Sequence, residues 1–389
     1  MSDEKDLALK GTLQNIAKEK DYENYKLEIT PIDTGGANFS SRLYAGKITA
    51  PNKPDIEWFG KVAIINEEFR IDMPVQVYRL EQFAYSTLMR NYDALESKFE
   101  VPEKYRLKRS KLYGYSEVSP HEVIVIEDLA AKGYGSQDRL QSIQWPLASA
   151  AVQQLAILHA LTWGVQHYYP DEYDQIFAMI KGNGVSESLA NIIMVTTEKN
   201  LSLINEKYRE RVRKYLENMA ETAPKLRAPC NRAVLAHGDF RTSNIMYKVD
   251  ENGQTSAVII DYQTLHIGSA INDLLYFIFS GSDAEFRRHH YHPLLDHYYE
   301  QLSLALTRLK LEPEKVFPRE EYDDEIKKYL KNGLVLAMLS LPMMCVETSE
   351  APALDDDLQM QKIMEVKPSE LCLDRLQQVV EDFISWGEL

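Results

Sequence analysis

Hydrophobic and polar positions alternate along the first third of the chain in a way that predicts a small β-sheet. A stretch with helical periodicity at residues 1–20 comes first. Strand-like runs of alternating or β-branched apolar residues follow at residues 25–32, 42–49, 58–65 and 122–126. A second helical stretch, residues 74–89, lies between the last two runs and is followed by an irregular basic segment. We therefore predict an N-terminal sheet that carries one main helix.

The rest of the chain has mostly the periodicity of helices, and the change comes at residues 127–135. This segment contains turn residues and no periodicity, so we place a hinge there. Residues 1–126 then form a small N-terminal β-sheet lobe, and residues 136–389 form a larger, mainly helical C-terminal lobe. The sequence predicts an α+β fold with two lobes, as expected for a chain of 389 residues.

Within the C-terminal lobe, apolar residues at helical spacing predict a helix over residues 146–163, with Gly164 as its end. Two strand-like pieces interrupt the helices, at residues 233–236 and 257–260. Between them lie the turn-forming residues 250–253. Each piece ends at an acidic motif, so the polar groups after these strands are candidates for chemistry.

Composition and charge narrow the class of partner. The chain is 44% hydrophobic and 26% charged, as ordinary globular proteins are. Its net charge of -15 argues against a nucleic acid partner, which would need a basic face. We expect the basic stretch at residues 104–111 to be a solvated face. The longest apolar run, residues 334–346, is too short to span a membrane, so we predict a buried helix and no membrane partner.

The cysteines and the N-terminus indicate the compartment. Cys230, Cys345 and Cys372 are far apart, which predicts neither a disulfide framework nor a zinc site. The first residues are charged, without the apolar segment of a signal peptide. We therefore expect a reducing, cytoplasmic location.

A polar motif, His237-Gly-Asp-Phe-Arg-Thr-Ser-Asn244, directly follows the first strand-like piece. It places Asp239 and Asn244 five positions apart, which is the spacing of kinase catalytic loops. Asp261 ends the second piece, 22 positions after Asp239, where kinases carry a metal-binding Asp. Each motif alone is weak, but their occurrence in this order predicts phosphoryl transfer, with Asp239 beside the attacking hydroxyl.

Upstream, Lys61 lies in an apolar strand-like run and needs a partner if it is buried. Glu81, on the helix that follows, is the natural candidate, and the pair would hold a nucleotide's α- and β-phosphates. The alternative is that Lys61 snorkels at a strand edge and Glu81 is an exposed helix charge.

The turn between the first two strands is rich in glycine and contains Gly35, Gly36, Ala37 and Asn38. Glycines let backbone N–H groups approach phosphate oxygens, so we expect these residues to contact the nucleotide. No Gly-Lys-Ser/Thr follows, so the turn is not a Walker A motif. A plain hairpin turn would have the same sequence.

The chemical class of the acceptor follows from a short spacing. Protein kinases need a long segment ending in Ala-Pro-Glu to bind a peptide. Here Asp273 follows Asp261 by only 12 positions, so no such segment fits. We expect a small-molecule alcohol as the acceptor.

Several segments together resemble the ecdysteroid kinase-like family of insects, which is related to choline and aminoglycoside kinases. They are residues 125–129, 155–160, 234–246, 258–263 and 268–277. The resemblance implies a two-lobed protein-kinase-like fold and ATP with Mg as cofactors. It also implies transfer of the γ-phosphoryl group to a hydroxyl, which in the named members belongs to ecdysteroid hormones.

The resemblance also implies roles for single residues. Asp239 matches the catalytic Asp, and Asn244 and Asp261 match the metal ligands. Lys61 and Glu81 match the ion pair of the family, and Glu127 to Leu129 match its adenine-contacting hinge. Asp273 matches a carboxylate that braces the catalytic loop, and His237 matches a residue that orients it. His159 resembles a core histidine and receives no role.

Arg241 departs from the family pattern, which commonly has a large aromatic residue two places after the catalytic Asp. We expect its guanidinium to contact the transferring phosphoryl group or an anionic acceptor. Two other functions remain open. One is a choline or aminoglycoside kinase, which the acidic balance favours. The other is a nucleotide- or hormone-binding pseudokinase, which would require the loss of a metal ligand or of the catalytic carboxylate.

Overall fold

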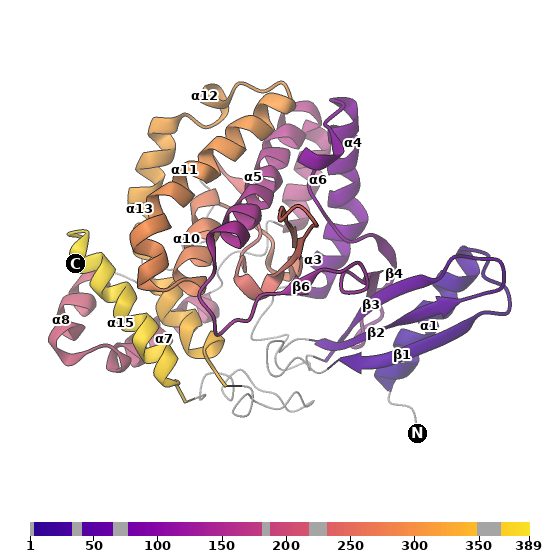
Figure 1. The fold of residues 1–389 in the computed structure, drawn as a ribbon, viewed down its shortest axis with the longest axis horizontal. Helices are drawn as coiled ribbons and strands as arrows, with labels where there is room; N and C mark the ends of the chain where they lie inside the picture. The colour runs from indigo at the N-terminus through magenta and orange to yellow at the C-terminus, as the bar shows by residue number, and fades with distance from the viewer. Residues whose placement is uncertain (1–3, 33–40, 65–76, 181–186, 218–231, 348–366) are drawn as a thin grey trace.

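The computed structural model describes residues 4–32, 41–64, 77–180, 187–217, 232–347 and 367–389, without the side chains of residues 187–190 and 192. In Figure 1 the N-terminal sheet and its first helix extend to one side of a larger helical body. The fold is α+β with two lobes, as the sequence predicts. The hinge at residues 127–135 stays a prediction.

A five-stranded antiparallel sheet forms the N-terminal lobe. Its order is β1-β2-β3-β5-β4. The strands are β1 Lys26–Ile32, β2 Ser41–Thr49, β3 Ile56–Ala63, β4 Leu112–Ser116 and β5 Val123–Glu127. Four of them match predicted runs, whereas β4 lies in the segment that the sequence analysis described as irregular. Its sequence Leu-Tyr-Gly-Tyr-Ser has a central glycine and no clear alternation, so pairing with β5 decides its conformation.

The two faces of this sheet carry different helices. Helix α1, Glu4–Glu19, covers one face, where its residues Leu9 and Leu13 pack against Trp58 and Val62 of β3. Successive strand residues point to opposite faces, so Lys61 points away from α1. The opposite face therefore carries the polar site.

A continuous helical segment lies on that opposite face. It consists of α3 Val77–Phe83, the π-helix Ala84–Leu88 and α4 Met89–Lys98. It begins inside the predicted stretch and continues nine residues beyond its predicted end at residue 89. Buried residues of α4 such as Leu95 join the core of the helical body, so α4 fastens the sheet to that body.

The helical body is built around α5, Trp145–Tyr168, which packs against α11. Gly164 lies inside α5, so the prediction that it ends this helix is wrong. A Cβ at this position would lie 2.5 Å from Leu95 Cδ2 and 3.0 Å from Leu309 Cδ1. Glycine is therefore explained by the close approach of neighbouring side chains.

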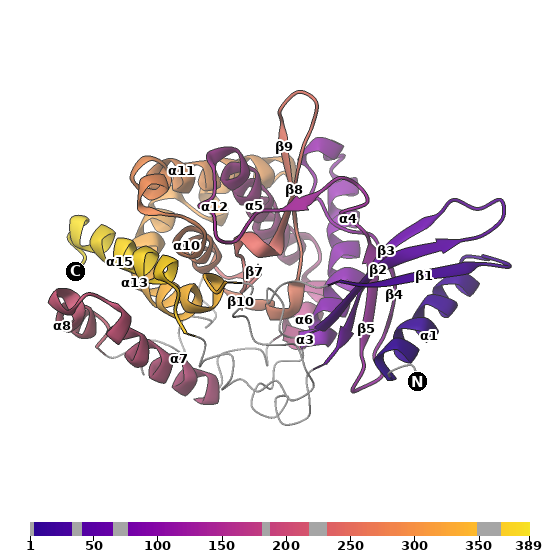
Figure 2. The same ribbon diagram turned by 60° about the horizontal axis from the view of Figure 1, so that its bottom comes forward.

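The other helices of this body follow in chain order, and Figure 2 shows α7, α8 and α15 along its edge. They are α6 Pro170–Ile180, α7 Glu187–Asn200, α8 Glu206–Tyr215, α10 Ala270–Gly281, α11 Ala284–Arg308, α12 Pro313–Val316, α13 Arg319–Met344 and α15 Glu370–Ser385. The apolar run at residues 334–346 belongs mostly to α13 and is buried, as predicted. In the described part of the chain, no helix combines the length and hydrophobicity needed to cross a bilayer.

Short strands connect the two acidic motifs to this body. β7 Val234–Ala236 pairs with β10 His266–Gly268, and β8 Ile245–Val249 forms a hairpin with β9 Thr255–Ile259. The turn at residues 250–253 thus joins β8 to β9 and not the two strand-like pieces that the sequence indicated. A further strand, β6 Gly135–Ser136, extends the hairpin.

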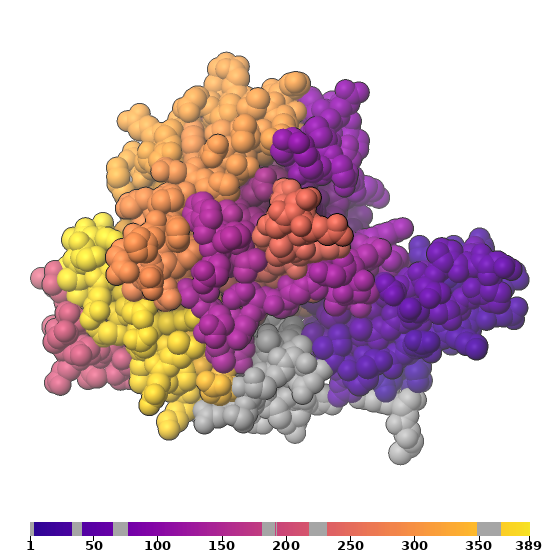
Figure 3. Space-filling model, in the orientation of Figure 1, coloured from indigo at the N-terminus to yellow at the C-terminus, as the bar shows by residue number. Residues whose placement is uncertain are grey.

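The basic stretch at residues 104–111 is not the solvated face that we expected. Leu107 and Ser110 are buried, and the Lys108 ammonium donates to Ser256 Oγ of the β9 strand at 2.7 Å. The segment therefore connects the sheet to the β8–β9 hairpin. Figure 3 shows this hairpin on the surface between the sheet and the helices.

Candidate active site

The loop after β7 carries the first acidic motif, and a glycine allows its shape. Gly238 has φ +82°, and a Cβ there would lie 2.4 Å from the carbonyl oxygen of Thr264. Only glycine fits this left-handed conformation and close approach. Asp239 follows directly, and its side chain is 24% exposed.

Asp273, in the first turn of α10, accepts hydrogen bonds from this loop. Its carboxylate accepts from the backbone N–H of His237 at 2.6 Å and of Gly238 at 2.8 Å. Burial acts to raise the pKa of Asp273, but the hydrogen bond and charge of His159 and the other nearby imidazoles outweigh it, so the pKa is about 2. Asp273 is therefore ionised and fixes the loop backbone.

His159 is buried, as expected of a core histidine, but it also has a supporting contact that the sequence analysis did not predict. Its Nε2 donates to Asp273 Oδ2 at 3.3 Å, because a carboxylate can only accept, and its Nδ1 lies 2.8 Å from the Tyr298 hydroxyl. All three side chains are buried. The sequence indicates that a histidine on an apolar helix is buried. It does not indicate the partners of this histidine, because they come from α10 and α11.

Two neighbours hold the Asp239 carboxylate. Arg241 Nε lies 3.1 Å from both carboxylate oxygens, and Asn244 Nδ2 donates to Oδ2 at 2.8 Å. Burial acts to lower the pKa of Arg241, but Asp239 outweighs it and the pKa is raised, so the guanidinium stays charged. Within the described residues, its two terminal nitrogens make no hydrogen bond and remain available to a ligand.

The second acidic motif is tied to the first through Ile260. The N–H of Ile260 donates to the Asn244 carbonyl at 2.9 Å, and His237 Nε2 donates to the Ile260 carbonyl at 3.0 Å. The two partners of Ile260, His237 and Asn244, lie before and after Asp239 in the chain. Asp261, next in the chain, has a left-handed backbone with φ +68° and a side chain that is 25% exposed. The fold thus brings the two acidic motifs together.

Lys61 joins this group from β3. Its Nζ lies 2.7 Å from Glu81 Oε1 and 2.9 Å from Asp261 Oδ1. Burial acts to lower the pKa of Lys61, but the two carboxylates outweigh it and raise the pKa. Burial also acts to raise the pKa of Asp261, yet Lys61 and more distant cations lower it overall. The contact between Lys61 and Glu81 is the one that the sequence predicts, and the contact with Asp261 is additional.

Gln263 is a second residue that sequence reasoning missed. Its side-chain amide donates to Glu81 Oε2 at 3.2 Å, so the two Glu81 oxygens have separate partners. Gln263 lies two positions after Asp261, but only the fold brings it to α3. Glu81 is 1% exposed, and these contacts satisfy it.

Of the predicted hinge residues, Glu127 is the last residue of strand β5, and Asp128 and Leu129 follow it. The N–H of Glu127 donates to the backbone carbonyl of Lys111, and the N–H of Asp128 donates to the backbone carbonyl of Glu57. The N–H of Leu129 has no hydrogen-bond partner in the part of the chain that the structure describes, whereas its carbonyl accepts from Lys132 and Tyr134. A free donor at this point suits a ligand with an acceptor nitrogen. The predicted glycine-loop residues Gly35, Gly36, Ala37 and Asn38 lie outside the described residues.

The predicted metal ligands fit Mg²⁺ by the type of their donor atoms. Asn244 donates from its amide nitrogen to Asp239, so its amide oxygen points the other way, and Asp261 offers a partly exposed carboxylate. Mg²⁺ prefers oxygen ligands and is held by one or two carboxylates together with substrate phosphates. The described residues contain no cluster of three or more His, Cys, Asp or Glu side chains suited to a metal. A cation here would therefore depend on phosphate oxygens as well.

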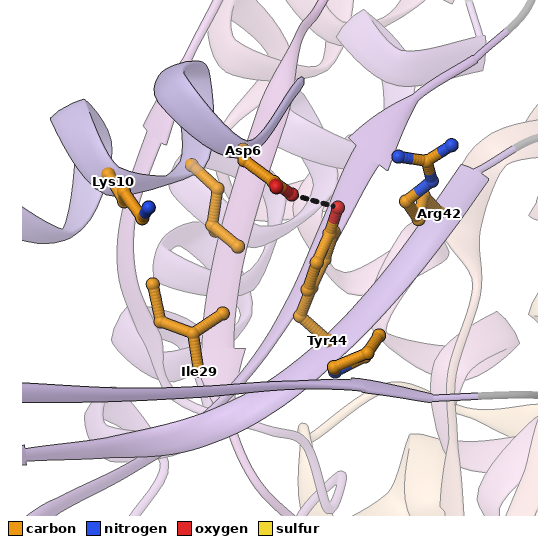
Figure 4. Close-up of a pocket in the computed structure, with 7 residues that line it drawn as sticks. Asp6, Lys10, Ile29, Arg42 and Tyr44 are labelled. Atoms are coloured by element: carbon orange, nitrogen blue, oxygen red, sulfur yellow. Dashed lines mark hydrogen bonds between the residues drawn. The ribbon is translucent and has the colours of Figure 1, made fainter. Parts of the chain in front are cut away.

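A separate pocket of about 400 Å³ lies between α1 and the first two strands (Figure 4). It is lined by Asp6, Leu9, Lys10, Ile29, Pro31, Arg42 and Tyr44. Tyr44 points to the α1 face, opposite to Lys61, and its hydroxyl donates to Asp6 Oδ1 at 2.7 Å. This pocket is therefore distinct from the candidate active site.

The fold has two lobes, Lys61 bridges two carboxylates, and the neighbouring Asp239 loop is held by Asp273. Together these features define a protein of the kinase-like class. The chain belongs to the ecdysteroid kinase-like family, whose profile matches residues 35–311. Membership of this family makes it a small-molecule kinase. No protein of curated function matches the chain in sequence.

Solved structures with similar folds are distant in sequence. A Plasmodium vivax ethanolamine kinase has a TM-score of 0.50 and 12% identity, over 100% of this chain and 92% of its own. The GDP complex of aminoglycoside 2'-phosphotransferase-IIIa has a TM-score of 0.46 and 11% identity, over 96% of this chain and 99% of its own. At these identities the likeness to the ethanolamine kinase supports the fold alone.

Proposed function

We propose that this protein transfers the γ-phosphoryl group of ATP to a hydroxyl of a small molecule, and that the acceptor is an ecdysteroid or a related steroid or xenobiotic alcohol. The observation that carries the proposal is the position of Lys61 between Glu81 and Asp261. A lysine held in this way can bind phosphate oxygens beside a carboxylate that binds a metal. The family to which the chain belongs supports the ecdysteroid as acceptor.

Residues of both lobes would hold the cofactors. Lys61 binds the α- and β-phosphates, and the free N–H of Leu129 with the backbone of Glu127 contacts the adenine. Asn244 and Asp261 would hold Mg²⁺ through oxygen atoms, where the ion would supply positive charge that offsets the phosphates.

Asp239 and Arg241 act on the reacting groups. The acceptor oxygen attacks the γ-phosphorus, the bond to the ADP oxygen breaks, and Asp239 accepts the hydroxyl proton. The terminal nitrogens of Arg241 contact the transferring phosphoryl group, whose charge they offset. His237 and Asp273 position this loop without touching the substrates.

An amino alcohol such as choline is the second candidate acceptor, because a net charge of -15 attracts cations. Arg241 opposes this candidate, since its guanidinium is paired with the Asp239 carboxylate and would repel a cationic acceptor nearby. A pseudokinase is disfavoured because Asp239, Asn244 and Asp261 are all present.

Mass spectrometry of reactions with ecdysteroids, choline and plant alcohols tests the proposal, with ATP consumption measured in parallel. We expect a phosphate adduct on an ecdysteroid or related alcohol, and its loss in Asp239→Asn by a factor of about 100 or more. An adduct on choline alone would move the acceptor to the second candidate. ATP consumption that no acceptor stimulates, equal in wild type and Asp239→Asn, would contradict a kinase function.

Arg241→Ala tests the phosphoryl contact separately. We expect kcat to fall, because charge stabilisation in the transition state is lost. A rise in the acceptor KM with unchanged kcat would instead assign Arg241 to acceptor binding.

A further inference from the structure

Helix α10 runs alongside the loop that joins β7 to β8, and three contacts fix the register between them. Asp273, in the first turn, accepts hydrogen bonds from the backbone at the start of this loop. One turn later the ring of Phe277 packs on that of Phe240, with centroids 5.1 Å apart. One further turn on, a Cβ at Gly281 would lie 2.6 Å from Thr242 Cγ2. Successive turns of α10 therefore contact successive residues of the loop.

Tyr276 lies on this side of α10, three positions after Asp273 and one before Phe277. Residues three or four positions apart share a helix face, so Tyr276 is placed beside the part of the loop between the first two contacts. Electrostatics agree with this placement. Burial acts to lower the pKa of Arg241, and Asp239 first and Tyr276 second act to raise it. The phenol of Tyr276 therefore lies near the guanidinium that pairs with Asp239.

Solvent exposure distinguishes Tyr276 from the rest of α10. The helix belongs wholly to the described part of the chain, and each of its other residues is buried, whereas Tyr276 is partly exposed. On the loop beside it, the side chains of Asp239 and Arg241 are 24% and 16% exposed. A carboxylate, a guanidinium and a phenol ring thus reach solvent close to one another.

The acceptor must reach the Asp239 carboxylate, and the neighbours of this carboxylate differ in whether they leave room. Phe240 and Asn244 are buried, so protein covers both of them. Arg241 and Tyr276 are partly exposed, so a ligand can approach along them. A hydroxyl at Asp239 therefore brings its carbon skeleton next to these two side chains. The guanidinium offers charge, and the tyrosine ring offers an apolar face.

We propose that Tyr276 belongs to the acceptor site and that its ring selects alcohols whose reacting hydroxyl is attached to an apolar ring skeleton. This assignment rests on the proposed function, in which Asp239 accepts the proton of that hydroxyl. Arg241 meets the charge of the phosphoryl group, and Tyr276 packs against the skeleton. A rigid ring system packs on an aromatic side chain with little loss of conformational freedom, whereas an open chain loses more.

Two other roles for Tyr276 predict different results in the same experiments. In the first, its hydroxyl holds Arg241 in place and its ring does not touch the acceptor. In the second, the ring binds a cationic acceptor such as choline, because aromatic faces attract quaternary ammonium groups. The neighbouring guanidinium opposes this second role by repulsion. Removing the hydroxyl alone and removing the whole side chain distinguish the three roles.

Tyr276→Ala and Tyr276→Phe separate the ring from the hydroxyl in steady-state kinetics. We expect Tyr276→Ala to raise the KM for an ecdysteroid about tenfold, because the contact area of one aromatic ring is lost. Its kcat and its KM for ATP should stay the same, since this contact is equal in the ground and transition states. The KM for an open-chain plant alcohol should rise by about threefold or less. Tyr276→Phe keeps the ring and should change each KM by less than about twofold.

Tyr215→Ala is the matched control. Tyr215 is also a partly exposed helical tyrosine near a cation, with Lys331 Nζ 5.0 Å from its ring centroid. It lies on α8 at the edge of the helical body (Figure 2), where its ring contacts Phe383 of α15. Tyr215→Ala should leave the KM for both acceptors unchanged. A larger effect of Tyr276→Ala then belongs to its place beside Asp239 and not to the loss of a surface ring in general.

Equilibrium dialysis of an ecdysteroid against the full chain, without nucleotide, tests the contact independently of catalysis. We expect Tyr276→Ala to weaken ecdysteroid binding about tenfold, because the same ring contact is lost. Tyr276→Phe and Tyr215→Ala should bind the ecdysteroid as the wild type does. Choline binding should be the same in the wild type and in Tyr276→Ala.

Each contrary result has its own meaning. Unchanged acceptor KM and binding in Tyr276→Ala, with phosphate adducts still formed, would overturn the assignment of Tyr276 and leave the kinase function intact. A fall in the kcat of Tyr276→Phe as large as that of Arg241→Ala, at unchanged acceptor KM, would make Tyr276 a positioning residue instead. Loss of choline binding in Tyr276→Ala would show that the ring recognises a cation and would overturn the selection of ring alcohols.

Failure of the proposed function has a separate signature. If the wild type forms no phosphate adduct on any acceptor, the proposed function is wrong, and dialysis alone decides the role of Tyr276. Weaker ecdysteroid binding in Tyr276→Ala would still support a contact with this ligand. A wild type that binds no ecdysteroid would overturn the assignment of Tyr276 as well.

Discussion

The two halves of the candidate site are held in different ways. The loop with Asp239 is fixed by hydrogen bonds from its backbone to Asp273, which is buried and paired with His159. The turn with Asp261 is tied to this loop by hydrogen bonds of Ile260, but the Asp261 carboxylate itself is held by the charge of Lys61, from a strand 200 positions away in the sequence. The first half is independent of any ligand, whereas the second uses a contact that a bound cation or phosphate would compete for.

The two carboxylates that contact Lys61 differ in solvent exposure, and this difference indicates which of them can exchange its partner. Of the two partners of Lys61, Glu81 is 1% exposed and Asp261 is 25% exposed. Water already reaches Asp261, so exchanging its bond to Lys61 costs less free energy than exchanging the buried bond to Glu81. We infer that Glu81 keeps Lys61 in place while Asp261 changes partner when nucleotide and metal bind.

The largest expected effect comes from Lys61→Met. This change leaves Glu81 and Asp261 close together without a cation, and breaking a buried ion pair in this way costs about 4 kcal/mol of unfolding free energy. Nucleotide binding should also be lost. Chemical denaturation and calorimetric titration with ATP measure the two effects.

Lys47→Met is the matched control, because Lys47 lies on the neighbouring strand β2 and also contacts two carboxylates, Asp55 and Glu57. These contacts are solvent-exposed, so stability and nucleotide binding should change little. Equal losses in the two variants would mean that the bridge at Lys61 has no special importance.

Asp273→Asn tests the first half. An amide can accept only on its oxygen, so one of the two backbone donors, His237 or Gly238, would face an NH2 group. We expect a loss of about 3 kcal/mol in unfolding free energy and a lower kcat, with the KM for ATP nearly unchanged. Asp283→Asn is the control, since Asp283 caps α11 and asparagine caps a helix equally well. A rise in the KM for ATP as large as the fall in kcat would show that the two halves are not separate.

The pH dependence of stability sharpens the same comparison. The pKa of Asp273 is lowered from 3.8 to about 2, so its contribution of about 2 kcal/mol is present above pH 3.8 and lost as the pH falls toward 2. The difference in unfolding free energy between wild type and Asp273→Asn should therefore shrink across this window. A difference that stays constant in acid would assign the effect to packing and not to charge.

The sequence predicts the candidate catalytic and metal-binding residues better than it predicts the residues that hold them in place. The spacing and order of the two acidic motifs, taken together, mark Asp239, Asn244 and Asp261 as candidates. The expected burial of a lysine predicts a partner such as Glu81. The supports are invisible at this level. His159 and Gln263 receive their partners from elements far away in the chain, and sequence periodicity carries no information on such contacts.

The same limit explains the errors in the fold. Gly164 has the local signal of a helix end, yet it lies inside α5 because Leu95 and Leu309 approach it closely. Strand β4 lacks alternation and forms because β5 offers it an edge. In both cases a tertiary contact overrides the local preference of the sequence.

The smallest expected effect concerns Tyr298, which contacts His159 and so supports the Asp239 loop only indirectly. Tyr298→Phe removes the hydroxyl that lies 2.8 Å from His159 Nδ1, at a cost of about 1 kcal/mol. Tyr322→Phe is the control, because its equally buried hydroxyl donates to the Leu295 carbonyl at 2.8 Å and its ring stacks on Tyr298. Both variants should lose similar stability. Only Tyr298→Phe should move the acid transition of Asp273 to higher pH, since a less firmly held His159 stabilises the carboxylate less. If the acid transitions of the two variants coincide, the support ends at His159, and the stability of the loop rests on Asp273 and that histidine alone.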